Sequence, residues 1–417
     1  MDIMTDMHID ERPSLLARVF LPFVAGYYVS YCFRSVNALL GPQIAAEFGF
    51  GAADLGLLTG VYFLIFGMVQ IPAGVLLDRF GPRRVDAGLL LIAAAGTVIF
   101  ATAQSFAGVV AGRALIGLGV SVCLMASFQA FLLWYPMERI ATLNSLAFAV
   151  GILGAITVSV PLEAALRFAD WRAIMLGFSV VTLAASAAIF FAVPEHRRAA
   201  QSRTSLSAAL RVVGVLLADP GFRRTAVMVT TSQCAAVSLY TLWIATWLRD
   251  VAGFDRPAVG RALLVVSLAL IAGYLFFGRA GDALARRRQP EVPLVAAGVA
   301  CSSACLLLLA LGVTSGALWL WAAFIFSSSS ATLAYSIVSR RFPKEMAGRV
   351  NTTLNTFIFT GMFLGQWAVG LVLQRWPATA AGYAPEAYGW ALGALWVIQL
   401  AGLAWYWSSR RLLAAPG

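Results

Sequence analysis

The amino-acid sequence predicts an all-α membrane protein with twelve transmembrane helices, arranged as two six-helix halves. The first observation is its composition, which is 60% hydrophobic and only 12% charged, with a mean hydropathy of +0.83. Soluble domains carry about 25% charged residues, so most of this protein's surface must face lipid. The second observation is a series of apolar runs, each close to the ~20 residues that a helix needs to cross a bilayer. This composition excludes a disordered chain, a disulfide scaffold and a nucleic-acid-binding domain.

The apolar runs form two groups of six, separated by a polar stretch rich in arginine. The first group covers 16–40, 52–77, 84–104, 108–134, 139–163 and 172–194. The second group covers 225–249, 258–282, 291–312, 316–340, 347–374 and 387–410. We therefore expect a tail over 1–15, a first bundle over 16–194, a linker over 195–224, a second bundle over 225–410 and a tail over 411–417.

The basic residues predict the orientation. More than two thirds of the 30 Lys and Arg residues fall on one side of the predicted membrane, in the tails, the linker and alternate loops. Basic residues accumulate in cytoplasmic segments, which accounts for the net charge of +11 and places both termini in the cytoplasm. Lys344 is the only lysine of a chain rich in Ala, Gly and Arg. This usage is typical of a bacterial genome of high GC content and favours the inner membrane.

The two halves also repeat each other in sequence. Gly74 and Asp78 recur in the second half as Gly278 and Asp282, and each pair is followed by consecutive arginines. Parallel six-helix repeats are typical of secondary transporters whose substrate site lies near the membrane midplane, between the halves. The repeat therefore predicts a site where the two bundles meet.

The loop between the second and third spans carries the most specific motif. It reads Gly74-Val-Leu-Leu-Asp78-Arg79-Phe-Gly81-Pro-Arg83-Arg84. This segment resembles the loop signature of the major facilitator superfamily, and the resemblance covers nearly the whole chain. It implies the superfamily fold and a gate on the cytoplasmic side, in which Gly74 permits close contact between helices. The gating residues that it implies are Gly74, Asp78, Arg79, Gly81 and Arg83, with Asp282 in the degraded second copy.

A finer resemblance lies in the first and fourth spans. The first span contains Tyr31-Cys-Phe-Arg34-Ser-Val-Asn37, and the fourth contains Arg113-Ala-Leu-Ile-Gly117-Leu-Gly119. Both segments resemble the organic-anion branch of the superfamily, which includes sialin-like, hexonate and phthalate carriers. The resemblance implies that Arg34 and Arg113 bind an anionic substrate. Phe33 and Val120 stand where that branch has acidic residues associated with proton coupling, so proton symport by that route is not implied.

The two arginines indicate an anion site without the resemblance as well. Charged side chains inside spans are costly and normally face a cavity on a transport pathway. Arg34 and Arg113 lie toward the outer ends of their predicted spans, and Tyr31 shares a helical face with Arg34, with Asn37 one step beyond. All 19 acidic residues fall in tails, loops or terminal turns, so two buried cations without a buried acid predict that the substrate supplies the negative charge. The alternative is structural: each arginine bonds helix carbonyls or extends toward the membrane surface.

The second half predicts a different, neutral lining. Tyr240 in the seventh span, Tyr335 in the tenth and Asn355 in the eleventh lie on stripes of aromatic and uncharged polar side chains. Such stripes suit a substrate whose far end is apolar or hydroxylated. Packing between helices is the alternative, especially for Trp243 and Trp247.

These features predict a carrier of a small organic anion that works by alternating access, as a monomer in the lipid bilayer. Protons or a counter-anion are the coupling partners that remain open. A proton-driven exporter of drugs or metabolites is the first alternative, disfavoured because no buried acid and no G-x-x-x-G-P motif in the fifth span are found. A transporter-like receptor is the second. No enzyme, metal, cofactor or nucleic-acid partner is expected, since no His, Asp or Glu cluster in the spans has ligand spacing.

Overall fold

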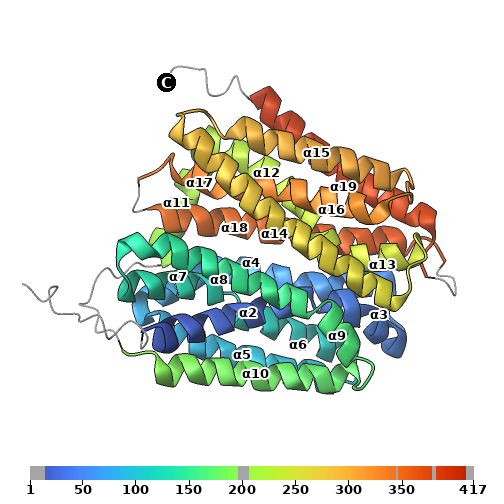
Figure 1. Cartoon of the computed structure of the whole chain (residues 1–417), viewed down its shortest axis with the longest axis horizontal. Helices are drawn as coiled ribbons and strands as arrows, with labels where there is room; N and C mark the ends of the chain where they lie inside the picture. Colours follow the sequence, from blue (N-terminus) through green and yellow to red (C-terminus); the bar gives the residue numbers. More distant parts are fainter. Residues whose placement is uncertain (1–14, 196–205, 344–345, 378–381, 410–417) are drawn as a thin grey trace, which may run out of the picture.

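The computed structural model describes residues 15–195, 206–343, 346–377 and 382–409. Within these residues, 12 helices are long and apolar enough to cross a membrane. Figure 1 shows them as two bundles, with the first half in blue to green and the second half in yellow to red. The predicted all-α membrane class is confirmed. Residues 1–14 and 411–417 of the predicted tails, and 196–205 of the predicted linker, lie outside the described residues.

The first half begins with a broken span: the π-helical turn η2 (Leu16–Phe20), α2 (Leu21–Ser35) and α3 (Asn37–Phe48). The other spans are α4 (Ala52–Phe80), α5 (Pro82–Thr102), α6 (Phe106–Gly119) with α7 (Cys123–Trp134), α8 (Met137–Thr157) with α9 (Val160–Ala165), and α10 (Trp171–Ala192). We call the end where α2 begins and α10 ends the inner end, since the basic residues predict that it faces the cytoplasm. The opposite end is the outer end.

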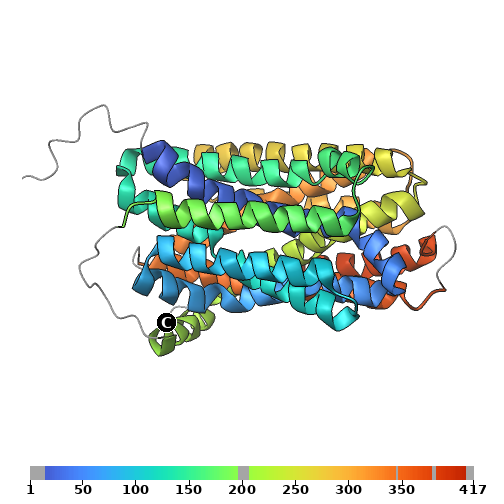
Figure 2. The same cartoon turned by 90° about the horizontal axis from the view of Figure 1, so that it is seen from below.

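The second half begins with α12 (Pro220–Ser238), the π-helical turn η3 (Leu239–Trp243) and α13 (Ile244–Asp250). The other spans are α14 (Arg256–Arg286), α15 (Val292–Ala310), α16 (Ala317–Ser328) with η4 (Ser329–Thr332) and α17 (Leu333–Ser339), α18 (Ala347–Leu373), and α19 (Pro385–Ser408). Within the predicted linker, residues Leu206–Ala218 form helix α11. Figure 2 shows α11 at the inner end, beside the bundles rather than inside them.

Local chemistry explains where several helices begin and end. Asp170, Asp219 and Asp255 each accept a hydrogen bond from a backbone N–H three residues later, at the starts of α10, α12 and α14. Such caps satisfy N–H groups that the first turn of a helix leaves without a partner. Gly81 ends α4 with a φ of 79°, a backbone region that favours glycine, and so makes the turn into α5.

The first and fourth spans of each half are interrupted. The breaks fall between α2 and α3, between α6 and α7, at η3 and at η4. Irregular backbone at membrane depth is tolerated where it is buried in protein or lines a cavity. The candidate residues Arg34, Arg113, Tyr240 and Tyr335 all lie in these four spans. The internal repeat therefore extends to these helix breaks, and the four broken spans carry these four candidate residues.

Helices α4 and α18 make the main contact between the halves. Glycines allow it: a Cβ at Gly56 would lie 2.7 Å from the carbonyl oxygen of Gln366, and a Cβ at Gly67 would lie 2.9 Å from Cβ of Phe359. At the outer end, α3 also contacts α13, and α9 contacts α14. These contacts hold the halves together from the middle of the molecule to its outer end.

Candidate functional site

Arg34 lies in the last turn of α2, where the two halves meet. Its guanidinium carbon is 4.8 Å from the ring centre of Tyr31 and 5.5 Å from that of Phe66 in the first half, and 5.6 Å from that of Phe359 in the second half. Contacts between a cation and aromatic faces offset part of the cost of burying the charge. No carboxylate of a described residue forms an ion pair with Arg34, and its Nε lacks a hydrogen-bond partner. The contact between the halves therefore holds a cation that is only partly compensated.

Tyrosines from both halves surround this guanidinium and interact with it electrostatically. They are Tyr27, Tyr31 and Tyr62 of the first half, and Tyr240, Tyr274 and Tyr335 of the second half. The Tyr240 hydroxyl lies 3.0 Å from Oγ of Ser267, and the Tyr335 hydroxyl donates to Oδ1 of Asn355. Phenol hydroxyls can donate and accept hydrogen bonds. The structure thus brings the predicted residues Tyr31, Tyr240 and Tyr335 together around Arg34.

Arg113 is fully buried inside the first half. Its guanidinium carbon lies 4.7 Å from the ring centre of Tyr62, whose hydroxyl donates to the Ser30 carbonyl at 3.3 Å. Nε, Nη1 and Nη2 of Arg113 all lack a hydrogen-bond partner. The structural alternative, in which Arg113 bonds helix carbonyls, is therefore not what this conformation shows. An unpaired buried guanidinium strongly favours acceptor groups.

Asn37 and Asn355 make hydrogen bonds of different kinds. Asn37 donates to Oγ1 of Thr59 at 3.1 Å within the first half, and its own Oδ1 has no partner. Nδ2 of Asn355 donates to Oε1 of Gln70 at 3.4 Å, across the contact between the halves. Nε2 of Gln70 in turn donates to the carbonyl of Ser121, in the break of the fourth span, at 3.3 Å. Asn355 is thus part of a polar connection from the second half to the broken fourth span.

The motif at the inner end of α4 makes its contacts chiefly within the first half. Gln129 donates to Asp78 at 3.3 Å, and Nε of Arg83 donates to the carbonyl of Phe190 at 2.8 Å. The guanidinium of Arg79 lies 5.2 Å from the ring centre of Phe80, and Asp282 of the second copy is exposed. No heavy atom lies within 4 Å of the position of a Cβ at Gly74. The close helix contact expected at Gly74 is therefore not made in this conformation.

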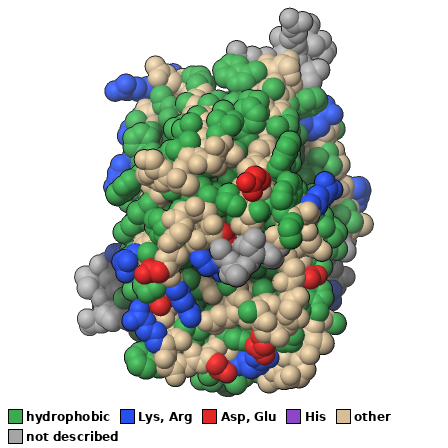
Figure 3. Space-filling model, turned by 90° about the vertical axis from the view of Figure 1, so that its right-hand side faces the viewer, with side chains coloured by type: hydrophobic (Ala, Val, Ile, Leu, Met, Phe, Trp, Pro, Cys, Tyr) green, Lys and Arg blue, Asp and Glu red, His purple; other side chains and the backbone are tan. Residues whose placement is uncertain are grey.

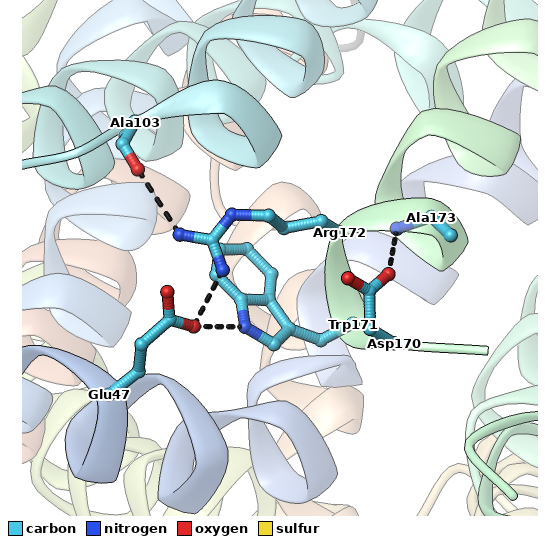
Figure 4. Close-up of polar contacts among 6 residues, drawn as sticks. All are labelled: Glu47, Ala103, Asp170, Trp171, Arg172 and Ala173. Atoms are coloured by element: carbon cyan, nitrogen blue, oxygen red, sulfur yellow. Dashed lines mark hydrogen bonds and ion pairs between the residues drawn. The ribbon is translucent and has the colours of Figure 1, made fainter.

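At the outer end of the first half, Glu47 near the end of α3 links this helix to the start of α10. Figure 4 shows its carboxylate accepting hydrogen bonds from Nε1 of Trp171 at 2.8 Å and Nη1 of Arg172 at 2.6 Å. Nη2 of Arg172 also donates to the Ala103 carbonyl at 3.3 Å. The hydrogen bond from Arg172 holds the pKa of Glu47 below its ordinary value. Figure 3 shows the outer end of the molecule, where charged side chains are scattered among polar and hydrophobic ones.

Two expectations about buried charge are corrected. The helix of the first span does not end near residue 40: it resumes after Val36 and runs to Phe48, beyond the apolar stretch Leu16–Ser35 that is long enough to cross a membrane. Arg34 therefore lies near the middle of the combined helix rather than toward its outer end. The acids are not confined to tails, loops and terminal turns either: Asp86 lies in the second turn of α5 and is 0% exposed. It was missed because sequence position alone does not show that α2, α7 and α10 cover it.

Several residues of the site were not predicted from the sequence. Four of them are aromatic neighbours of Arg34 or Arg113: Tyr62, Tyr274, Phe66 and Phe359. Aromatic residues are common in apolar spans, so the sequence pattern does not distinguish these four from the others. Gly56 and Gly60 did carry a signal, since glycines four residues apart often mark close helix contacts in membranes. Within the described residues, no group of three or more His, Cys, Asp or Glu side chains could hold a metal ion.

Comparisons with known proteins give this arrangement a family. The "Probable sulfoacetate transporter SauU" of Cupriavidus necator is 26% identical over 266 residues, which cover 59% of this chain and 60% of that protein. The "Probable L-galactonate transporter" of Escherichia coli is 24% identical over 340 residues, covering 73% of this chain and 70% of that protein.

A solved structure shares the whole fold. It is a bacterial homologue of the human lysosomal transporter Spinster, in an inward-facing and unoccupied conformation, with a TM-score of 0.75 and 16% identity. The similarity covers 94% of this chain and 96% of that chain. The model of the Major Facilitator Superfamily matches residues 23–366, well over half of the sequence. With its two six-helix halves and its inner-end motif, the chain belongs to the major facilitator superfamily, a family of transporters and not of enzymes.

Proposed function

We propose that this protein carries a small organic anion of the carboxylate type across the inner membrane by alternating access, with both termini in the cytoplasm. The observation that carries the proposal is Arg34. Its guanidinium lies where the halves meet, pairs with no described carboxylate, and is surrounded by tyrosines of both halves. A substrate carboxylate there would supply the missing negative charge.

The chemistry of the guanidinium favours a planar or tetrahedral anionic group. Arginine presents several N–H donors in a fixed fork and binds carboxylates and similar anions through paired hydrogen bonds. Buried away from water, an unpaired cation is unfavourable, so an incoming anion gains both hydrogen bonds and charge compensation. The relatives named as transporters of sulfoacetate and L-galactonate support this class, because both compounds carry an anionic group.

The arrangement of the two halves around this point supports alternating access. The halves touch through α4 and α18 beside Arg34 and through α3 and α13 at the outer end. At the inner end, the ion pairs Arg84–Glu195 and Arg341–Asp219 each join groups of a single half. Rocking about the central contact would expose Arg34 to either side in turn. The residues around Asp78 would then form the inner gate.

The test is uptake into proteoliposomes of labelled monocarboxylates, dicarboxylates, sugar acids and lipophilic cations. We expect saturable flux of an anion, reduced about tenfold or more in Arg34→Ala, because a hydrogen bond to a charged group contributes about 1.5–3 kcal/mol. Arg34→Lys keeps the charge but not the paired donors, so its flux should lie between that of the unaltered protein and that of Arg34→Ala. Arg261→Ala, which removes an exposed arginine of α14, is the matched control and should transport as the unaltered protein does.

Two outcomes would overturn the proposal. Flux of a cation that survives Arg34→Ala would move the protein to the exporters of the superfamily. Saturable binding of an anion with no flux in either direction would indicate a receptor rather than a carrier.

A further inference from the structure

Asp86 is a buried acid that the anion site does not use. It lies in the second turn of α5, toward the inner end of the first half, and is 0% exposed. Neither Oδ1 nor Oδ2 has a hydrogen-bond partner. An ionised carboxylate without partners is very unfavourable in a medium of low dielectric constant, whereas the neutral acid is tolerated. Burial without partners therefore favours the protonated form of Asp86 in this conformation.

The helices packed around Asp86 offer it no cation. On α2, a Cβ at Gly26 would lie 3.7 Å from Oδ2, so the carboxyl group points at the glycine. On α10, the side chain of Ile189 lies beside the same point: its Cδ1 is 3.5 Å from the position that a Cβ at Gly26 would take. On α7, the titratable group that faces the carboxyl is the thiol of Cys123, which is only a weak hydrogen-bond donor.

The basic residues nearest in sequence are engaged elsewhere. Nε of Arg83 donates to the carbonyl of Phe190 at 2.8 Å, and Arg84 forms an ion pair with Glu195. The two arginines thus contact α10 and the residue Glu195 that follows it, and neither forms an ion pair with the buried carboxyl. The lack of compensation at Asp86 is therefore a property of the packed bundle and not of a missing arginine nearby.

The position of Asp86 connects it to the broken fourth span. Helix α6, which carries Arg113, ends at Gly119, and α7 begins at Cys123, the residue that faces Asp86. A Cβ at Gly119 would lie 2.5 Å from the Leu89 carbonyl oxygen, so α5 packs directly into the break. The first turn of a helix has free N–H groups and the positive end of its dipole. An ionised Asp86 would be attracted to that end of α7, so loss of the proton would draw the start of α7 toward the carboxylate and alter the break.

We propose that Asp86 is a proton-binding site, occupied in this conformation and emptied when the break of the fourth span rearranges, and that it couples anion movement to the proton gradient. One proton would be taken from water on one side and returned to water on the other. A conformational change that alters proton affinity must by linkage respond to pH. Only the coupling rests on the proposed anion transport; the proton site does not.

The first test needs no substrate. Infrared spectra of the purified protein at neutral pH should contain the C=O stretch of a protonated carboxylic acid, and this band should be lost in Asp86→Asn. Glu163→Gln is the matched control: Glu163 is 6% exposed but forms an ion pair with Arg167 at 3.0 Å, so its removal should leave the band unchanged. Asp86→Glu is a second variant, to be measured in case Asp86→Asn does not fold. Because it keeps a carboxylic acid at this position, it should shift the frequency of the band without removing the band. A spectrum without the band, or one in which Asp86→Asn or Asp86→Glu leaves the band unchanged, would overturn the proton site.

The second test addresses coupling. In proteoliposomes, steady-state accumulation of the anion should change by about tenfold for each unit of pH difference, if one proton moves per anion. Asp86→Asn should abolish this response while exchange of labelled for unlabelled anion continues. The coupling is refuted if Asp86→Asn responds to the gradient as the unaltered protein does. Failure of the unaltered protein to move any anion would instead refute the proposed function, and the infrared result would stand independently.

Discussion

The first and fourth spans are broken in both halves, but the two halves differ in how they bury charge. The first half contains Arg113 and Asp86, both 0% exposed and without hydrogen-bond partners, and it contributes Arg34 to the contact between the halves. The second half also buries an arginine, Arg224, but Nε of that residue donates to the Tyr406 carbonyl at 2.6 Å. Two fully buried charges of the first half thus lack a hydrogen-bond partner, whereas the buried arginine of the second half has one.

A second difference, this time in exposure, appears where each half links its first span to its last at the outer end. Glu47 of the first half bonds Trp171 and Arg172 and keeps 42% of its side chain exposed. Asp250 of the second half has a side chain that is 0% exposed and is paired with Arg249. It also accepts hydrogen bonds from the Tyr383 N–H and the Tyr388 hydroxyl.

The comparison indicates a division of roles. Unpaired buried charge is expensive, and in membrane proteins it is normally kept where function needs it. The buried polar groups of the second half are mostly neutral side chains, such as Gln399, which donates to Ser302 at 2.7 Å while its Oε1 has no hydrogen-bond partner. We infer that the first half binds the charged partners of transport and that the second half shapes the neutral side of the site.

The largest expected effect comes from replacing the buried arginine of each half by methionine. Arg113→Met should keep or raise the unfolding temperature, because it removes an unpaired buried charge, but should lower anion flux about tenfold or more. Arg224→Met should do the reverse: it loses a charged hydrogen bond, costing about 1.5–3 kcal/mol of stability, and keeps flux per folded molecule. Thermal unfolding and proteoliposome uptake measure both quantities. If Arg113→Met destabilises the protein as much as Arg224→Met does, the contrast between the halves is wrong.

A smaller effect is expected at the contact where the halves meet. Gly56→Ala would place a Cβ 2.7 Å from the backbone oxygen of Gln366, so α4 and α18 must separate and this conformation loses stability. Gly177→Ala on α10 meets nothing within 4 Å and should stabilise its helix by up to about 1 kcal/mol. Thermal unfolding of the two variants should therefore shift in opposite directions. Equal shifts would show that the glycine face of α4 does not govern the contact.

The smallest effect is a pH dependence at Glu47. Its pKa is lowered in the folded protein, so the carboxylate stabilises the fold above its unfolded-state pKa, and this contribution disappears as the pH falls through the folded-state pKa. Glu47→Gln should therefore lower the unfolding temperature slightly at neutral pH and not at all in acid. The effect is small because the side chain is partly exposed and water screens the ion pair. A difference that persists unchanged in acid would mean that Glu47 acts through packing and not through its charge.

The sequence by itself was sufficient for the membrane class, the number of spans and the superfamily, because lipid imposes length and hydropathy on every span separately. It was also sufficient to single out Arg34 and Arg113, since any charge within an apolar run stands out. Tyr31, Tyr240 and Tyr335 could be proposed because they recur at helical spacing on faces with other polar residues. All of these signals are local to one helix.

Tertiary structure alone decided which groups meet and which are left without partners. The ring of tyrosines around Arg34 joins residues of both halves, and the bond between Gln70 and Asn355 links side chains far apart in the chain. Asp86 lies near a helix start, a position that sequence reasoning treats as solvated. Its burial results from three other helices that close over it, and hydropathy within one segment carries no information about that packing.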